Sequence, residues 1–269
     1  MTPPADSADT PALPDLARRM RSWLFDEALP FWQENALDRV HGGFHERLDL
    51  SGKPDLTTAR RLRVQARQIY VFSQAHLMGW SGPALEIVEA GYEFLTHRGW
   101  LDEGGWLHLF TPQGGVFDDR RDTYDHAFVL FSLAWAHRAL GRHDPLTWAE
   151  RTLAFMDEEL SDPVHGGFLE GLPPSTPRRQ NPHMHYLEAV LALHAATGEQ
   201  AYVDRARKTV DLFRQHFFDP RAGVLREYFA DDFSALDDDV ARMVEPGHHY
   251  EWVWRAPRNR TDDRGIRPS

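Results

Sequence analysis

The sequence predicts an all-α fold in which pairs of helices repeat and stack into a ring. A short phrase built on Asp and Gly-Gly-aromatic returns four times, beginning at Asp38, Asp102, Asp162 and, in a worn copy, Asp219. The steps between these aspartates are 64, 60 and 57 residues. Between the copies, apolar residues recur with helical period. A fixed period of this size is typical of one supersecondary unit stacked on copies of itself, and such helical pairs close into a toroid, the (α/α)-barrel arrangement.

The first unit begins with an amphipathic helix. Leu16, Met20, Trp23 and Leu24 fall on one face at helical spacing, and the pattern ends near Leu37. The second helix of this unit is predicted over residues 61–78, followed by a glycine at position 79 that can end it.

The remaining units repeat this pairing. A two-faced helix is predicted over residues 83–98, with Pro83 at its start, and a richly apolar one over residues 124–140. Further helices are predicted over residues 146–160, 187–197 and 201–218. Because one helix of each pair is two-faced and the other nearly apolar, we expect an outer and an inner ring. Strands are expected only in short hairpins such as residues 105–110.

The two ends depart from the repeat. Residues 1–14 are rich in Pro, Asp and Ala and predict a disordered lead without the pattern of a signal peptide. Residues 15–254 form the predicted barrel domain. Residues 255–269 hold five Arg and two Pro with almost nothing to bury, which predicts a disordered, aberrant tail. Since that tail interrupts an inner helix, we expect a C-terminally truncated chain and an incomplete ring of about four helical pairs plus a fragment.

The composition narrows the classes of function. The chain has 269 residues, 42% of them hydrophobic, and no cysteine, which excludes disulfides, a thiolate nucleophile and Cys-ligated metals. The formal net charge of -11 disfavours nucleic acid and anionic membrane surfaces as partners. No apolar run approaches the length of a membrane span. We therefore expect a cytoplasmic protein without a membrane or nucleic-acid partner, and a homo-oligomer is compatible with the sequence.

Each inner helix carries unusual polar residues near its start. The four sets are Arg61, Arg63, Gln65 and Arg67; Asp122, Tyr124, Asp125 and His126; Gln180, Asn181, His183, His185 and Glu188; and Glu245, His248, His249 and Glu251. Repeat geometry places these starts on one face of the ring, so the sets should converge on one cavity mouth. Helix N-termini lower the pKa of nearby imidazoles, and a neutral histidine suits a general base.

Structural roles compete with functional ones for several of these residues. His126 could be a plain helix-start residue, and His185 a hydrogen-bonded core histidine. His248 and Glu251 lie three apart and so share one helical face. The sequence leaves open whether His248 or His249 faces the cavity.

Four stretches resemble the N-acylglucosamine 2-epimerase family, which includes mannose (aldose-ketose) isomerases and cellobiose 2-epimerases. They are RLRVQARQIY at residues 61–70, DTYDHAF at 122–128, NPHMHYLEA at 181–189 and PGHHYEW at 246–252. The resemblance covers about residues 15–254. It implies a ring of six helical pairs, an (α/α)6 toroid, which needs no metal and no cofactor.

The resemblance also implies roles for individual residues. Arg67 would bind a sugar hydroxyl or carbonyl oxygen, and His185 would hold substrate oxygens. His248 would be one acid/base group, with Glu251 beside it positioning hydroxyls or helping ring opening. The family's second acid/base histidine comes from the last helical pair, and this chain ends before it. The other predicted substrate contacts are Tyr124, His126, Asn181 and Glu188.

The residue types suit this chemistry independently. Moving a proton at the carbon beside a sugar carbonyl needs a base, an acid for the neighbouring oxygen, and donors that stabilise an enediolate. His248 as base, Arg67 as oxyanion partner and His185 as donor cover these roles. A proton returned to C1 makes a ketose, and one returned to the opposite face of C2 makes an epimer.

The substrate expected from the sequence is an unphosphorylated hexose such as mannose, since the chain has no phosphate-binding Gly loop. We therefore predict mannose-fructose type isomerisation, with N-acylglucosamine or cellobiose 2-epimerisation as alternatives.

Three other classes stay open. Glycoside hydrolases also use helical toroids with paired carboxylates, which Asp125, Glu188 and Glu251 could supply here. A metal could be held by His183, His185 and His248, but the first two sit two apart and point away from each other. The third class is an inactive truncated remnant.

Overall fold

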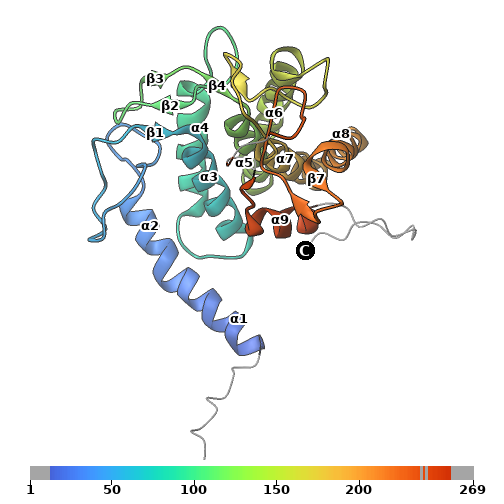
Figure 1. The fold of residues 1–269 in the computed structure, drawn as a ribbon. Coiled ribbons are helices and arrows are strands. Elements are labelled where there is room, and N and C mark those ends of the chain that lie inside the picture. Colours follow the sequence, from blue (N-terminus) through green and yellow to red (C-terminus); the bar gives the residue numbers. More distant parts are fainter. Residues whose placement is uncertain (1–12, 237–238, 240–241, 256–269) are drawn as a thin grey trace, which may run out of the picture.

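The computed structural model of the protein describes residues 13–236, 239 and 242–255. The predictions for residues 1–12 and 256–269 lie outside these described residues. Within them the fold is all-α and of the (α/α)-toroid type, as the sequence predicts (Figure 1). The domain bounds shift slightly at both ends. Helix α1 (Leu13–Ser22) begins two residues before the predicted domain, and Arg255 is the last residue of α9 (Pro246–Arg255) rather than part of a tail.

Four inner helices lie next to one another in chain order: α3 (Leu62–Leu77), α5 (Thr123–Leu140), α7 (Asn181–Thr197) and α9. The predicted ranges for α3 and α5 agree with the structure to within a residue. Helix α7 begins six residues before the predicted start. The first turn of α7 is polar, so the apolar period begins only after it. Pro182 is tolerated in this turn because the backbone N–H groups of a first helical turn have no partner within the helix.

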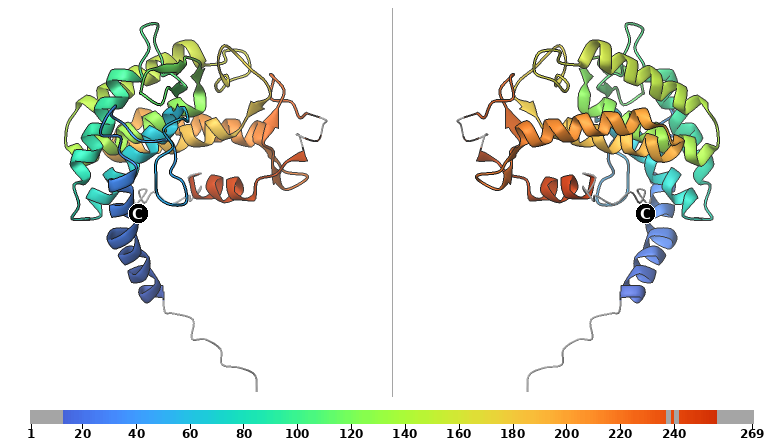
Figure 2. Two further views of the ribbon diagram at one scale, coloured as in Figure 1. Left: turned by 90° about the vertical axis from the view of Figure 1, so that its left-hand side faces the viewer. Right: turned by 90° about the vertical axis from the view of Figure 1, so that its right-hand side faces the viewer.

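Outer helices pack against the backs of the inner ones. The first is a segmented rod of α1, a π-helical stretch η1 (Trp23–Ala28) and α2 (Leu29–Asn35), and α1 extends away from the rest (Figures 1 and 2). Helix α4 (Ala84–Arg98) packs on α3, and α6 (Asp144–Phe155) packs on α5 and continues as η2 (Met156–Leu160). Helix α8 (Gln200–Leu212) packs on α7 and continues as η3 (Phe213–Phe217). No helix among the described residues is long and apolar enough to cross a membrane.

Short antiparallel strands tie each unit to the next. Strand β1 (Arg60–Arg61) pairs with β2 (Leu109–Phe110), which also pairs with β3 (Val116–Asp118). Strand β4 (Arg121–Asp122) pairs with β5 (Gly171–Leu172), and β6 (Arg178–Arg179) with β9 (Tyr228–Phe229). The remaining pair, β7 (Phe218–Asp219) with β8 (Val224–Leu225), closes the worn fourth turn. Three strands that lead into inner helices are thus held by the following unit, so consecutive helix starts meet on one face.

One backbone hydrogen bond repeats at each of these junctions and sets the register of the repeat. The N–H of Leu62 donates to the carbonyl of His108 at 3.1 Å. The N–H of Thr123 donates to Glu170 at 3.0 Å, and that of Gln180 to Glu227 at 3.2 Å. Positions 62, 123 and 180 are therefore equivalent. The acceptors are equivalent too. His108, Glu170 and Glu227 each stand two residues after the residue that ends the repeated phrase, namely Trp106, Phe168 and Leu225.

A polar side chain in the first turn of each inner helix holds the glycine turn of its unit. The turn N–H donates to Gln65 Oε1 at 2.7 Å, to His126 Nε2 at 3.0 Å, to His183 Nε2 at 3.0 Å and to His249 Nε2 at 2.8 Å. This close approach requires glycine. A Cβ on Gly167 would lie 2.6 Å from His183 Nε2, and the φ of Gly167 is +67°.

Candidate active site

An open pocket of about 620 Å³ lies where the inner-helix starts converge. It is lined by Arg61, Arg63, Arg67, His108, Arg120, Asp122, Tyr124, Glu170, Ser175, Thr176, Pro177, Arg179, Asn181 and Tyr228. Three of the predicted substrate-binding residues are in this lining, namely Arg67 from α3, Tyr124 from α5 and Asn181 from α7. The cross-unit strands explain this convergence, since they align the helix starts from which all three side chains come.

Arg67 is the cation that the pocket leaves most available. Its Nη2 donates to the hydroxyl of Tyr124 at 3.1 Å, and its guanidinium carbon lies 4.1 Å from the centre of the Phe128 ring. Arg61 and Arg63 are paired with Glu46 and Asp125, whereas the described residues place no carboxylate within ion-pair distance of Arg67. Its remaining donors are therefore available to an oxygen of a bound molecule.

His185 lies beside Tyr124 with its ring held from two sides. The ring centres are 5.0 Å apart and perpendicular, and the Phe128 ring lies at 4.4 Å. Nδ1 donates to Glu188 Oε2 at 3.0 Å. Burial lowers the pKa of His185, against the opposing effect of Glu188. A neutral imidazole with a fixed Nδ1–H results, and its Nε2 is left to accept a hydrogen bond from a substrate hydroxyl rather than to donate one, the role expected from the sequence.

Glu188 and Glu251 are joined by a residue that the sequence prediction assigned to the tail. Arg255 Nη2 lies 2.8 Å from Glu188 Oε1, and Arg255 also donates to Glu251. Burial alone would raise the pKa of Glu188, but the hydrogen bond from His185 and the charge of Arg255 outweigh it and hold that pKa below its ordinary value. Glu251 therefore pairs with Arg255 rather than with His248.

His248 reaches the same site from α9. Its Nε2 lies 3.4 Å from Asn181 Nδ2, and Asn181 lines the pocket. Its Nδ1 lies 2.9 Å from Oε2 of Glu227, a buried carboxylate that sequence reasoning missed. The adjacent His249 instead holds the backbone of Leu225. Of the two neighbouring histidines, His248 is thus the one beside the pocket.

His126 does not line the pocket, which corrects the prediction that it contacts the substrate. Its side chain is fully buried, Nε2 accepts from Trp106 N, and Nδ1 donates to Asp122 O at 2.8 Å. Burial lowers its pKa to about 4. His126 occupies the turn-holding position of Gln65, so both ring nitrogens are used by backbone groups.

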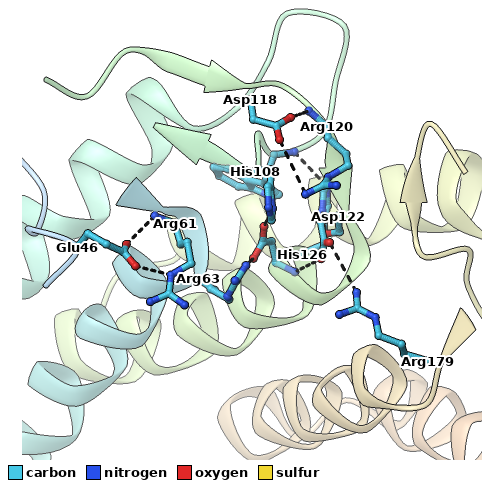
Figure 3. Close-up of polar contacts among 11 residues, drawn as sticks. Glu46, Arg61, Arg63, His108, Asp118, Arg120, Asp122, His126 and Arg179 are labelled. Carbon is cyan, nitrogen blue, oxygen red and sulfur yellow. Dashed lines mark hydrogen bonds and ion pairs between the residues drawn. The ribbon is translucent and has the colours of Figure 1, made fainter. Parts of the chain in front are cut away.

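A row of turn residues completes the site and was missed by the sequence prediction. These residues follow two positions after Phe44, Trp106, Phe168 and Leu225, the residues whose N–H groups the inner helices hold. They are Glu46, His108, Glu170 and Glu227. Glu170 accepts from Arg179 Nε at 2.6 Å, and His108 Nδ1 donates to Asp125 Oδ2 at 2.5 Å. Figure 3 shows two of these four side chains, Glu46 beside Arg61 and His108 near Asp122. The signal was present in the sequence, because all four positions share one offset within the repeated phrase.

One cluster among the described residues has the composition of a metal site: His108, Asp122 and Asp125, with ligand atoms within 4.8 Å of one another. Donors already use its oxygens. Asp125 accepts from Arg63 at 3.0 Å and from His108, while Asp122 accepts from the backbone of Asp125 at 3.2 Å. Burial, followed by the charge of Asp125, raises the pKa of Asp122. These contacts fit a network of ion pairs better than a metal cage, and independence from metals stays a prediction.

The histidine set considered for a metal does not assemble either. His183 is fully buried, with Nε2 accepting from Phe168 N and Nδ1 donating to Arg179 O at 3.2 Å. Its two ring nitrogens are therefore unavailable to a metal that His185 or His248 would share.

Comparison with known proteins gives one family. The family model described as N-acylglucosamine 2-epimerase (GlcNAc 2-epimerase) matches residues 42–256. A mannose-6-phosphate isomerase of Rhizobium meliloti (strain 1021) is 35% identical over 250 residues, which cover 88% of this chain and 62% of that protein. A D-mannose isomerase of Thermobifida fusca is 30% identical, over 87% of this chain and 60% of that protein.

Solved structures agree with this comparison. The cellobiose 2-epimerase of Spirochaeta thermophila DSM 6192 superimposes with a TM-score of 0.77 at 28% sequence identity, over 85% of this chain and 60% of that one. The chain therefore spans about three fifths of the length of the relatives it matches.

Proposed function

The chain belongs to the N-acylglucosamine 2-epimerase family, and on this premise we propose that its pocket binds an aldose and that His248 moves the proton at C2. The reaction we favour is isomerisation of the mannose-fructose type through an enediolate. Relatives named mannose-6-phosphate isomerase and D-mannose isomerase support this preference.

The observation that carries the proposal is the meeting of the predicted residues at one site. Arg67, Tyr124 and His185 contact one another in series, and His248 adjoins the pocket through Asn181. In the open-chain sugar, Nε2 of His248 takes the C2 proton while the C–H electron pair moves into an enediolate. The guanidinium of Arg67 stabilises the negative oxygen, and His185 and Tyr124 bind neighbouring hydroxyls. A proton moves from the C2 hydroxyl to the C1 oxygen, and His248 returns its proton to C1, which leaves the carbonyl at C2.

The test is exchange of the C2 hydrogen of mannose with deuterium in heavy water, followed by NMR. We expect exchange with the native chain and loss of exchange in His248→Gln. The matched control is His249→Gln, which places at the turn-holding position the residue type that Gln65 already provides. Exchange that survives in His248→Gln but is lost in His249→Gln would show that the base is His249 and not His248.

A phosphorylated sugar is the second candidate substrate, because one relative is named a mannose-6-phosphate isomerase and five arginines line the pocket. Four of these arginines are each paired with a carboxylate: Arg61 with Glu46, Arg63 with Asp125, Arg120 with Asp118 and Arg179 with Glu170. This balance of charge supports a neutral hexose. Rates with mannose and mannose 6-phosphate at equal concentration decide between the two.

The fate of the proton separates isomerase from epimerase. Fructose as the first product supports the favoured reaction, and glucose without fructose supports a 2-epimerase, as in the relative named cellobiose 2-epimerase. A glycoside hydrolase is disfavoured, since Asp125 is held by Arg63 and His108. It would instead release a new reducing end from an oligosaccharide. A cytoplasmic location and a homo-oligomer stay predictions.

A further inference from the structure

The contact that His248 makes with the fourth turn has a counterpart in the second unit. Asp125 and His248 stand at the same position of their inner helices, one residue before the turn-holding His126 and His249. Each meets the turn side chain of its own unit. The two distances are 2.5 Å for Asp125 to His108 and 2.9 Å for His248 to Glu227. The two units thus build the same carboxylate–imidazole pair with the partners exchanged.

The other two units show what the turn carboxylate does without such a partner. Val64 and Pro182 stand at the equivalent helix position in these units and offer no polar side chain. There the turn carboxylates pair with arginine, Glu46 with Arg61 and Glu170 with Arg179. Glu227 differs because its partner is the imidazole.

Glu227 is fixed from behind by buried groups. Its side chain is buried, and Oε2 accepts from Gln180 Nε2 at 2.8 Å and lies 2.9 Å from His248 Nδ1. Gln180 Nε2 also lies 3.1 Å from Nδ1. Gln180 is itself fully buried, and its Oε1 accepts from Trp252 Nε1 at 2.6 Å. The carboxylate cannot follow a rotation of the imidazole, so it selects one orientation of the ring.

The charge of Glu227 lacks another compensating cation in the part of the chain that the structure describes. No Arg or Lys lies within ion-pair distance there, and Oε1 is buried without a hydrogen-bond partner. A buried carboxylate is costly unless a positive charge balances it. An imidazolium formed at His248 supplies that charge.

We propose that Glu227 is the positioning residue for His248. It accepts the Nδ1–H of the imidazole, which leaves Nε2 unprotonated and directed to the substrate side. When Nε2 takes the C2 proton, the carboxylate balances the new positive charge until the proton is returned. This inference rests on the proposed function only in taking C2 of a sugar as the source of the proton. The contact between Glu227 and His248 exists without substrate.

The first experiment needs no activity. Nitrogen-15 NMR of the native chain, labelled in histidine and recorded at alkaline pH, reports the tautomer of His248, assigned by its loss in His248→Gln. We expect the neutral ring to be protonated at Nδ1 and its Nδ1–H signal to move in Glu227→Gln. Glu46→Gln is the matched control, since Glu46 occupies the same turn position but pairs with Arg61. Protonation at Nε2 in the native chain would overturn the proposal even if Glu227→Gln does not fold.

The second experiment separates positioning from packing. In Glu227→Gln, which keeps size and loses charge, kcat for C2 exchange should fall by about 100-fold or more while KM stays within about threefold, by analogy with loss of the aspartate in a serine-protease triad. Glu227→Asp restores the carboxylate and should recover part of the rate. An unchanged kcat in a folded Glu227→Gln, with an unmoved His248 signal, refutes the proposal. A native chain that exchanges no sugar, yet shows the Nδ1–H tautomer, refutes the proposed function alone.

Discussion

Arg67 combines three features in one side chain: a stack on Phe128, a hydrogen bond to Tyr124, and donors left for a ligand. A lysine would keep the positive charge but lose the planar fork and the stack. Because a hydrogen bond to a charged group contributes about 1.5–3 kcal/mol, Arg67→Lys should lower kcat/KM for C2 exchange roughly 10- to 100-fold.

The matched control for this change is Arg138→Lys. Arg138 also stacks on an aromatic ring, with its guanidinium carbon 4.3 Å from the centre of Trp135, but it does not line the pocket. Equal losses in both variants would show that the stack acts through stability. A loss confined to Arg67→Lys ties the guanidinium to the reaction.

The turn-holding histidines act at the scale of the element and make stability depend on pH. Burial lowers the pKa of His126 to about 4 and that of His183 to about 3, against an ordinary value of 6.5. Below pH 6.5 the unfolded chain binds protons that the folded chain does not, so stability is lost as pH falls towards these values. At pH 5 each histidine should cost about 2 kcal/mol relative to pH 7.

Glutamine at these positions should remove this dependence, because Gln65 holds the first turn in the same way. Urea unfolding of His126→Gln and His183→Gln at pH 7 and pH 5 measures it. The reciprocal change Gln65→His should introduce an acid sensitivity of similar size. If the free energy of unfolding of the double glutamine variant still falls as steeply with acid, other groups govern the transition.

The glycines of the turns differ in what surrounds them, and this difference is measurable. Gly79 and Gly167 both have positive φ values, +81° and +67°, so alanine costs about 1 kcal/mol or more at either site. A Cβ at Gly79 meets nothing within 4 Å, whereas one at Gly167 lies 2.6 Å from His183. Gly167→Ala should therefore lower the free energy of unfolding by about 1–3 kcal/mol more than Gly79→Ala. Equal losses would mean that the turn relaxes freely.

At the scale of the whole molecule, stability should be unevenly distributed. Helix α5 is packed between α3 and α7 and backed by α6, whereas α1 has no buried residue and extends from the body (Figure 1). Regions with few buried contacts open with small free energies. Amide hydrogen exchange, resolved by peptide, should therefore be slowest in α5 and α7 and fastest in α1. Strong protection of α1 would reveal a contact that the single chain does not make.

Much of the fold follows from local pattern. The four copies of the repeated phrase, three of them with Gly-Gly, mark the turns. The helical period between them predicts α3, α5 and the outer helices, because side-chain spacing along a helix is a property of the backbone. The start of α7 was placed six residues too late, since a polar first turn carries no apolar period. The pattern also predicts that Arg67, Tyr124 and Asn181 lie near one another, because they follow equivalent helix starts, and all three line the pocket.

What the sequence alone determined is the repeat: which segments are helices, where they turn, and which ends gather at one mouth. Only the tertiary structure decided which side chain of each neighbouring pair faces that mouth. Successive residues of a helix differ by about 100° around its axis. Packing sets that rotation, so His249 holds a turn while His248 meets Glu227 and adjoins the pocket. Arg63 and Asp125 meet across 62 residues for the same reason, because contact between distant segments depends on how helices stack.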